Sequence, residues 1–163
     1  MRPTTLQHLL NTKHVTMIDY GIQIKTQPKW VVSGESHLSY TTLTRLVECC
    51  REYHWQTDIA PYLASSSIDS ICKSISAKFL RPVLVSSTVK IIYKVKQVRN
   101  RSYELLFKIC GVDLQNIYAL FNIVLVFYNT ETDQTAAIPE SAKNNLTKLG
   151  HLATGEQSGE IHE

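Results

Sequence analysis

Apolar side chains recur every three to four positions between residues 40 and 55, which is the spacing of one helical face. The stripe consists of Leu43, Leu46, Val47, Cys50 and His54. Ser39, Thr41 and Thr42 offer side-chain oxygens that can cap the first turn. The pattern therefore predicts one long amphipathic helix over residues 40–55, with His54 as a core histidine.

A period of two replaces the helical period further along the chain. Apolar residues alternate with lysines over residues 83–98, and a second alternating segment follows a polar turn at residues 99–101. Residues 117–128 are apolar at nearly every position, which is typical of a strand covered on two sides. Residues 15–25 and 67–79 predict less regular strands, and residues 30–32 a short extended piece.

This order of elements predicts an α+β fold in which the helix covers one face of an antiparallel meander. We expect a loose N-terminal arm over residues 1–14 and one folded domain over residues 15–129. Residues 130–163 are expected to form a partly disordered C-terminal tail with one short helix over residues 139–149.

Composition narrows the class of protein. The 163 residues are 44% hydrophobic and 19% charged, with a net charge of +3, which fits one globular domain. The mild positive charge suits an anionic small ligand and falls short of a nucleic-acid-binding face. No apolar stretch is long enough to span a bilayer, and the N-terminus lacks the apolar core of a signal peptide. We expect a soluble, cytoplasmic protein with neither a nucleic-acid nor a membrane partner.

The four cysteines carry no metal-binding spacing such as CxxC. Cys49 and Cys50 are adjacent, so a disulfide between them would be strained. We therefore expect reduced thiols, no metal ion and no cofactor.

Local sequence also resembles a known superfamily. The run from Gly34 to Tyr40 that leads into the helix, with His37-Leu38 and the later Glu48, resembles the loop-to-helix segment of 4-hydroxybenzoyl-CoA-type thioesterases. The Arg-Ser pair at residues 101–102 fits the start of their penultimate strand. The run Cys50-Arg51-Glu52, followed by Ala-Pro at residues 60–61, is similar to the thioesterases that release chains from iterative enediyne polyketide synthases.

The resemblance implies the hotdog fold, a long central helix wrapped by a curled antiparallel sheet of five or six strands. It implies an acyl thioesterase that acts on acyl or polyketide chains carried by coenzyme A or acyl carrier protein, in product release. It also implies a homodimer, possibly a dimer of dimers, which would be a homotetramer. The sequence departs from both patterns: Ser33 stands where the first group has Asp and the second Asn, and Leu43 stands where the second has Tyr, whereas Arg51 matches.

Thioester hydrolysis requires a polarised carbonyl, an activated water and a leaving thiol. The N-terminus of the helix is the candidate oxyanion site, because its N–H groups carry partial positive charge. Arg51, Glu48 and His37 are the candidate catalytic residues, for polarisation, water activation and substrate orientation. The alternative reading of Glu48 and Arg51 is a simple i, i+3 ion pair on a solvated helix face.

Further residues are candidates for substrate binding by hydroxyl or positive charge. They are Ser33, Ser39, Tyr40, Thr44, Lys94, Lys96, Arg99 and Arg101. The four basic residues cluster along one predicted hairpin and would meet coenzyme A phosphates or the acidic face of a carrier protein. A solvated strand face that discourages aggregation explains the same charges equally well.

Two rival functions remain. A non-catalytic hotdog module that binds acyl chains is favoured by the absence of Asp at position 33. A 3-hydroxyacyl-thioester dehydratase would require a His-Phe-Pro-like loop, which His37-Leu38-Ser39 lacks.

Overall fold

The computed structural model describes residues 14–31 and 34–152. Its strands are β1 (Val15–Ile18), β2 (Gly21–Lys25), β3 (Ile68–Phe79), β4 (Thr88–Val98), β5 (Ser102–Gly111), β6 (Ile117–Asn129) and β7 (Gln134–Thr135). Its helices are α2 (Tyr40–His54) and α3 (Glu140–Leu152), with short turns at Pro28–Trp30, Trp55–Ile59 and Ala60–Tyr62.

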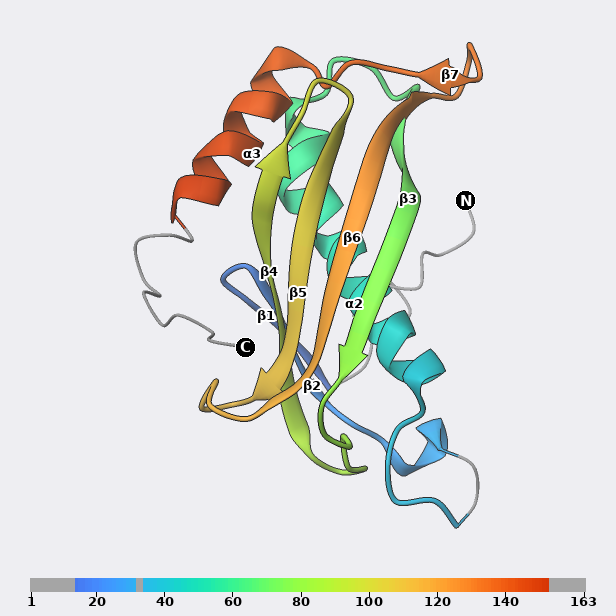
Figure 1. Cartoon of the computed structure of the whole chain (residues 1–163), viewed down its shortest axis with the longest axis vertical. Helices are drawn as coiled ribbons and strands as arrows, with labels where there is room; N and C mark the ends of the chain where they lie inside the picture. The colour runs from blue at the N-terminus through green and yellow to red at the C-terminus, as the bar shows by residue number, and fades with distance from the viewer. Residues whose placement is uncertain (1–13, 32–33, 153–163) are drawn as a thin grey trace.

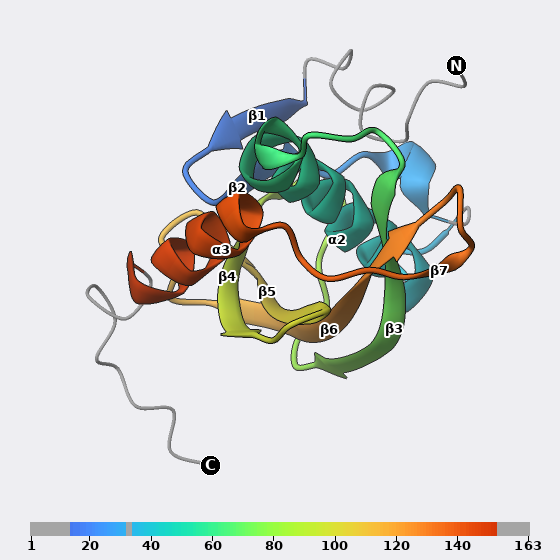
Figure 2. The same ribbon diagram turned by 90° about the horizontal axis from the view of Figure 1, so that it is seen from above.

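The sheet is antiparallel throughout and curls around α2. Its strand order is β1-β2-β4-β5-β6-β3, and the short β7 pairs with the end of β6. Figure 1 looks at the outer face of the sheet with α2 behind it, and Figure 2 shows α2 lying in the hollow of the sheet. The expected hotdog architecture, a long helix wrapped by a curled antiparallel sheet, is confirmed.

α2 forms where the apolar stripe predicts a helix, and every member of the stripe is buried. Ser39 is the N-cap, and its side chain accepts a hydrogen bond from the backbone N–H of Thr42. At the other end the helix continues through a π-helical turn, Trp55–Ile59, into a 3-10 turn that contains Pro61. A π-helical turn is rare and often marks a functional part of a helix.

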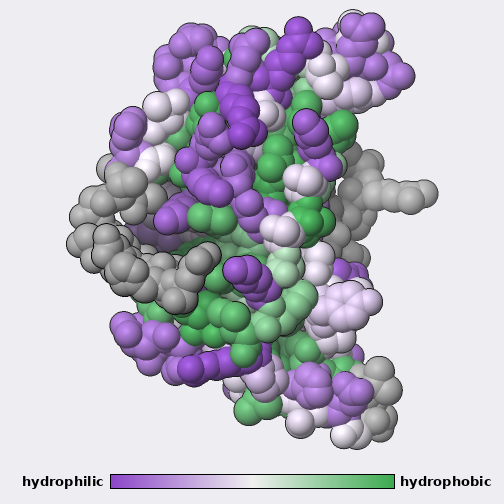
Figure 3. Space-filling model, in the orientation of Figure 1, coloured by the Kyte–Doolittle hydropathy of each residue, from purple (hydrophilic) through white to green (hydrophobic). Residues whose placement is uncertain are grey.

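The inner face of the sheet supplies the other half of the core. Tyr93, Phe107 and Phe121 lie opposite one another on β4, β5 and β6, and all three are buried. The outer face is different, because the side chains of β6 alternate between buried and half-buried. The described residues therefore cover the inner face of residues 117–128 fully and the outer face in part, and apolar and polar surface intermix on the outer face (Figure 3).

The N-terminal segment departs from the expected single strand. Residues 15–25 form a hairpin, β1–β2, because Tyr20 adopts a left-handed conformation with φ of 57° and reverses the chain. Gly21 follows, where an added Cβ would lie 2.2 Å from the carbonyl oxygen of Ile91 on β4. Of residues 30–32, which were expected to be extended, Trp30 instead ends a 3-10 turn, Pro28–Trp30, since Pro favours the first position of a helix. Val31 is extended, and residue 32 lies outside the described residues.

The polar segment over residues 67–79 forms one strand, β3, with a bulge between Cys72 and Ser74. Among the described residues, β3 is the last strand of the sheet and pairs with β6 alone. Its residues from Ile71 to Phe79 are all exposed in the protomer. This long, open edge lies beside α2 (Figure 1).

The C-terminal helix α3 lies beyond residue 129, where the sequence analysis ended the domain, yet it belongs to the same core. Ile138, Ala142 and Leu146 are buried, and Asn145 Nδ2 donates to the carbonyl oxygen of Asp58 at 2.8 Å. Within the described ranges, neither α2 nor α3 combines the length and the apolar character that crossing a bilayer demands.

Candidate active site

One flank of α2 faces β3 and stays open to solvent in part. Its side chains recur every three or four residues: Tyr40, Thr44, Glu48, Arg51 and Trp55. We call this set the open flank. The ring of Tyr40 lies 6.4 Å from that of Phe79 at one end, and Trp55 shares a pocket with Ile68 at the other. The helix and β3 therefore run side by side in opposite directions.

Glu48 and Arg51 form a tight pair at the middle of the open flank. Arg51 Nε donates to Glu48 Oε2 at 2.8 Å, and Arg51 Nη2 donates to Glu48 Oε1 at 2.5 Å. The Arg51 side chain is 17% exposed and that of Glu48 is 46% exposed. Neither of these two hydrogen bonds uses the N–H groups of Arg51 Nη1.

The environment keeps Arg51 charged. Burial lowers the pKa of Arg51, but the hydrogen bonds and the negative charge of Glu48 outweigh burial, and the pKa is raised. The same pair acts on the neighbouring strand. The pKa of the Cys72 thiol on β3 is raised, first by burial and then by the charge of Glu48, while Arg51 opposes the shift. Both charges of the pair therefore lie within electrostatic range of the inward side of β3, where Cys72 is placed.

The inward side of β3 is apolar near this pair and poorly covered. Cys72, Ile75 and Phe79 pair with Leu125, Ile123 and Ala119 of β6, which are core residues, so their side chains lie on the same inner face. Nevertheless Ile75 is 50% exposed and Phe79 is 49% exposed. An apolar ligand can therefore contact this surface without displacing the core.

The other predicted catalytic residue lies elsewhere. His37 is exposed, and its backbone forms a β-bridge with Leu84 ahead of α2. Glu48 lies about 12 Å further along the helix than Tyr40, at 1.5 Å per residue. The structure thus brings Glu48 and Arg51 together but does not bring His37 to them within one protomer.

The predicted binding residues at the start of α2 are mostly engaged with the helix itself. Ser39 Oγ accepts from the N–H of Thr42, and Thr44 Oγ1 donates to the carbonyl oxygen of Tyr40 at 2.8 Å. The Tyr40 side chain is 69% exposed. Ser33 lies outside the residues that the structure describes.

The four basic candidates lie on the β4–β5 hairpin. Lys94 and Lys96 project from the outer face, because Tyr93 and Val95 occupy the inner one, and Lys96 Nζ lies 3.0 Å from Glu104 Oε1. Near the hairpin turn, Arg99 donates to Gln97 and Arg101 to Thr135. These side chains do not line the open flank of the same protomer.

One known protein family matches most of the chain by sequence. The sequence model of the thioesterase-like superfamily matches residues 28–146, which include α2, the central strands and part of α3. The chain belongs to the thioesterase-like superfamily. No sequence among the curated proteins matches the chain.

Solved structures share this superfamily's fold with the chain at low sequence identity. One is the protein SAV2348 from Staphylococcus aureus in complex with CoA, with a TM-score of 0.71 and 8% identity over 86% of this chain and 88% of that one. Another is Slr0204, a 1,4-dihydroxy-2-naphthoyl-CoA thioesterase from Synechocystis, with a TM-score of 0.67 and 10% identity over 81% and 98%. The dynemicin thioesterase aligns with a TM-score of 0.68 and 10% identity over 80% and 96%. The expected resemblance to the thioesterase superfamily is confirmed, and the likeness to the dynemicin thioesterase is one of fold.

A buried polar cluster behind the open flank was missed by the sequence analysis, which took His54 only as a core residue. His54 Nδ1 lies 2.8 Å from Asp58 Oδ2, and the hydroxyl of Tyr93 donates to the same oxygen at 2.5 Å. Burial lowers the pKa of His54, while Asp58 opposes the shift. The i, i+4 spacing of His54 and Asp58 was the available signal.

Two buried atoms in and beside this cluster, His54 Nε2 and the hydroxyl oxygen of Tyr103, have no hydrogen-bond partner among the residues that the structure describes. The two rings lie 5.7 Å apart. The positive charge of Arg51 acts on the pKa of both residues. The cluster thus lies within electrostatic range of Arg51, the member of the open flank that carries the fixed positive charge. In the part of the chain that the structure describes, no three His, Cys, Asp or Glu side chains gather to hold a metal ion.

Proposed function

We propose that the protein hydrolyses an acyl thioester, carried by coenzyme A or by acyl carrier protein, at the open flank of α2. The observation that carries this proposal is the Glu48–Arg51 pair. It fixes a mostly buried guanidinium opposite the exposed apolar side of β3, in a chain of the thioesterase-like superfamily. A product-release role for a polyketide or fatty-acyl chain is the specific form of this proposal.

The residues of the pair suit the two demands of the reaction. An N–H of Arg51 Nη1 donates to the thioester carbonyl oxygen and stabilises the negative charge that develops there. Glu48 accepts a proton from water while the water oxygen attacks the carbonyl carbon. The tetrahedral intermediate then collapses, the C–S bond breaks, and the thiolate leaves with that proton as a free thiol beside the carboxylic acid product.

The proposal includes a homodimer formed along β3. The exposed edge strand β3 carries Asp69, Lys73 and Lys78. It also presents Ile71, Ile75 and Phe79 at about half exposure, which is apolar surface that a second copy can cover. Two β3 strands that pair antiparallel bring the Phe79 end of one copy to the Ile68 end of the other. Since Tyr40 lies beside Phe79, each α2 N-terminus then approaches the Arg51 end of the second copy.

This assembly gives the remaining candidates a role. The N-terminus of α2, with His37, Ser39 and Tyr40, contributes donors from one copy, and Glu48 with Arg51 contributes from the other. We include Arg99 and Arg101 as contacts for phosphates or an acidic carrier, on the hairpin at the C-terminal end of α2 (Figure 1). Lys94 and Lys96 reach only a partner that covers the outer face, as a dimer of dimers would.

Thiol release from a panel of acyl-CoAs and acyl-loaded carrier protein tests the activity. Arg51→Ala is expected to lower kcat/KM by about 10²–10³-fold, the usual effect of removing an oxyanion donor. The matched control is Arg45→Ala, an exposed arginine on the same helix about 120° away from Arg51 at 100° per residue. Equal activity of the two variants would remove Arg51 from the mechanism.

Glu48→Gln separates the two halves of the pair. Loss of thiol release with retained Arg51 would support Glu48 as the base, whereas full activity would leave catalysis to Arg51 and the helix N-terminus. Substrate binding without thiol release by the wild-type protein would instead identify an acyl-binding module, and loss of water from a 3-hydroxyacyl thioester would identify a dehydratase.

Sedimentation tests the assembly. Replacing Ile71 and Ile75 together by Asp is expected to convert the dimer to a monomer, since two carboxylates per copy would meet at the shared edge. Leu114→Asp, an exposed apolar position in the β5–β6 turn, is the matched control and should stay dimeric. A wild-type protein that sediments as a monomer at micromolar concentration would refute the dimer.

A further inference from the structure

Two buried polar atoms behind the open flank, His54 Nε2 and the Tyr103 hydroxyl, lack a partner among the described residues. Both residues are 0% exposed, and a buried polar group without a hydrogen bond costs free energy. Their ring centroids lie 5.7 Å apart, with an angle of 49° between the ring planes. Because the two atoms belong to one region of the core, a single bridging group can satisfy both.

The hydrogen-bond roles of the two atoms follow from their neighbours. The Tyr93 hydroxyl donates to Asp58 Oδ2 at 2.5 Å, and His54 Nδ1 lies 2.8 Å from the same oxygen. Since burial lowers the pKa of His54, the ring is neutral, with its proton on Nδ1 towards Asp58 and its lone pair on Nε2. Burial raises the pKa of Tyr103, so its hydroxyl keeps a proton that it can donate.

Arg51 is the charged side chain that acts on both atoms. It precedes His54 by three residues, so the two side chains are neighbours on the surface of α2. Its positive charge acts to lower the pKa of both His54 and Tyr103, and Tyr103 in turn acts on the pKa of Arg51. The hydrogen bonds to Glu48 use Arg51 Nε and Nη2. The two N–H groups of Nη1 are therefore the donors to be placed.

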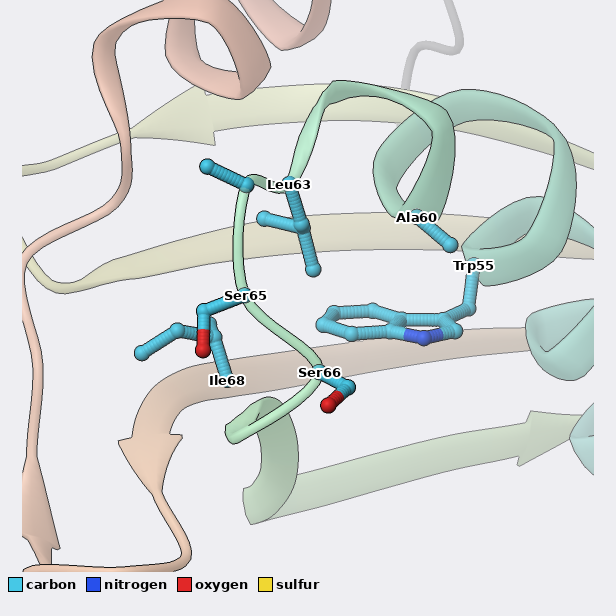
Figure 4. A pocket seen from close by; sticks show the side chains of 7 residues that line it. Trp55, Ala60, Leu63, Ser65, Ser66 and Ile68 are labelled. Carbon is cyan, nitrogen blue, oxygen red and sulfur yellow. The ribbon is translucent and has the colours of Figure 1, made fainter.

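The pocket at the C-terminal end of α2 does not supply the missing partner. Figure 4 shows its wall at Trp55 and Ile68, and neither His54 nor Tyr103 lines it. The buried Phe127 ring contacts both the Trp55 indole, at 5.6 Å, and the Tyr103 ring, at 5.9 Å. A ligand in this pocket therefore leaves the two buried atoms unsatisfied, and the bridging group has to be smaller and closer to Arg51.

We propose that Tyr103 and His54 are positioning residues that hold Arg51 through one internal water molecule. The water oxygen accepts from the Tyr103 hydroxyl and from one N–H of Arg51 Nη1, and the water donates to His54 Nε2. Three hydrogen bonds are usual for a buried water molecule. The inference rests on the proposed thioesterase function for its consequence, since the other N–H of Nη1 is then kept aimed at the thioester carbonyl.

Tyr103→Phe tests the role of the hydroxyl, because it removes that group alone and keeps the ring in the core. The variant is expected to lower kcat for thiol release by about 10–100-fold, since a displaced guanidinium no longer meets the charge that develops on the carbonyl oxygen. KM should change by less than about twofold, because the lost interaction acts in the transition state.

Tyr93→Phe is the matched control. Tyr93 also presents a buried hydroxyl on the inner face of the sheet, but it bonds Asp58 on the far side of the imidazole from Arg51. This variant loses a direct hydrogen bond and should lower the urea midpoint at least as much as Tyr103→Phe, yet leave kcat unchanged within about twofold. Equal losses of kcat in the two variants would reduce Tyr103 to a structural role and overturn the inference.

Nitrogen NMR separates this inference from the hydrolysis. Side-chain resonances of the labelled protein, assigned with His54→Gln and Arg51→Lys, report on His54 Nε2 and Arg51 Nε. Tyr103→Phe should move both resonances, because the water loses one of its donors, whereas Tyr93→Phe should leave that of Arg51 in place. Unmoved resonances in Tyr103→Phe would sink the inference even if thioesters are hydrolysed. Moved resonances in a protein that releases no thiol would uphold the link to Arg51 and refute the proposed function.

Discussion

The two sides of α2 differ in what covers them. On the inner side, the apolar stripe meets the curled sheet, and Leu46 and Val47 are no more than 4% exposed. On the open flank, β3 lies alongside the helix but leaves Glu48 and its own Ile75 about half exposed. One helix therefore serves the core and the candidate site at once.

This difference assigns stability and chemistry to separate side chains. Residues on the inner side are matched by neighbours that exclude water, so their loss opens a cavity or leaves a polar group unpaired. Residues on the open flank are held by one another, as the Glu48–Arg51 pair shows, and need a ligand or a second copy to be covered. Substitutions on the two sides should consequently affect different measurements.

Asp58→Ala is expected to have the largest effect on stability. It leaves two buried donors, His54 Nδ1–H and the Tyr93 hydroxyl, without their shared acceptor, and should lower the free energy of unfolding by about 3–5 kcal/mol. Urea denaturation measures the change. Tyr93→Phe removes only one of these hydrogen bonds and should be clearly milder; equal losses for the two variants would show that Asp58 does not organise the cluster.

Truncation of a single apolar side chain is expected to come next. Leu46→Ala should lower the free energy of unfolding by about 3 kcal/mol, because the buried side chain leaves a cavity. On the open flank, Thr44→Ala should change it by less than about 0.5 kcal/mol. The comparison between the inner side and the open flank fails if these two alanine variants unfold at the same urea concentration.

The sequence predicts the inner side of α2 well because burial imposes a period. The stripe from Leu43 to His54 recurs at the spacing of one helical face, and the alternation around Tyr93 and Phe107 recurs at that of a strand. These patterns, together with the order of elements, predict a helix packed on an antiparallel meander, whereas the hotdog fold itself was predicted from the family resemblance. Glu48 and Arg51 were identifiable as a pair for the same reason, since three residues on a helix fix their contact.

Contacts between elements that are distant in the sequence produce no periodic pattern of apolar residues. Asp58 meets Tyr93 across 35 positions of sequence, through a π-helical turn that no apolar period predicts. The open edge of β3 was also invisible, because Ile71 and Ile75 look like any strand residues until the strand order is known. The coverage of residues 117–128 was overestimated for a related reason: composition alone does not tell whether another layer packs on the outer face.

The pH dependence of stability probes the inner side without removing a contact. Burial lowers the pKa of His54, with Arg51 in the same direction and Asp58 opposing. Below the pKa of about 6.5 that the imidazole has in the unfolded chain, unfolding takes up a proton, so stability should fall as pH decreases from 7 to 5. In His54→Gln the urea midpoint should depend less on pH over this range; an unchanged slope would assign the dependence to other groups.

The smallest effect on stability is expected for Glu48→Gln. An i, i+3 pair with a carboxylate that is 46% exposed contributes only a few tenths of a kcal/mol, since solvent screens it, and glutamine keeps an oxygen that can accept from Arg51. Thermal unfolding of this variant should therefore match the wild type within about 1 °C. If Glu48 is the base, the same substitution should remove most thiol release. A large loss of stability with Glu48→Gln would mean that the Glu48–Arg51 pair stabilises the fold, as the His54–Asp58 cluster does. The open flank would then not be a separate functional surface.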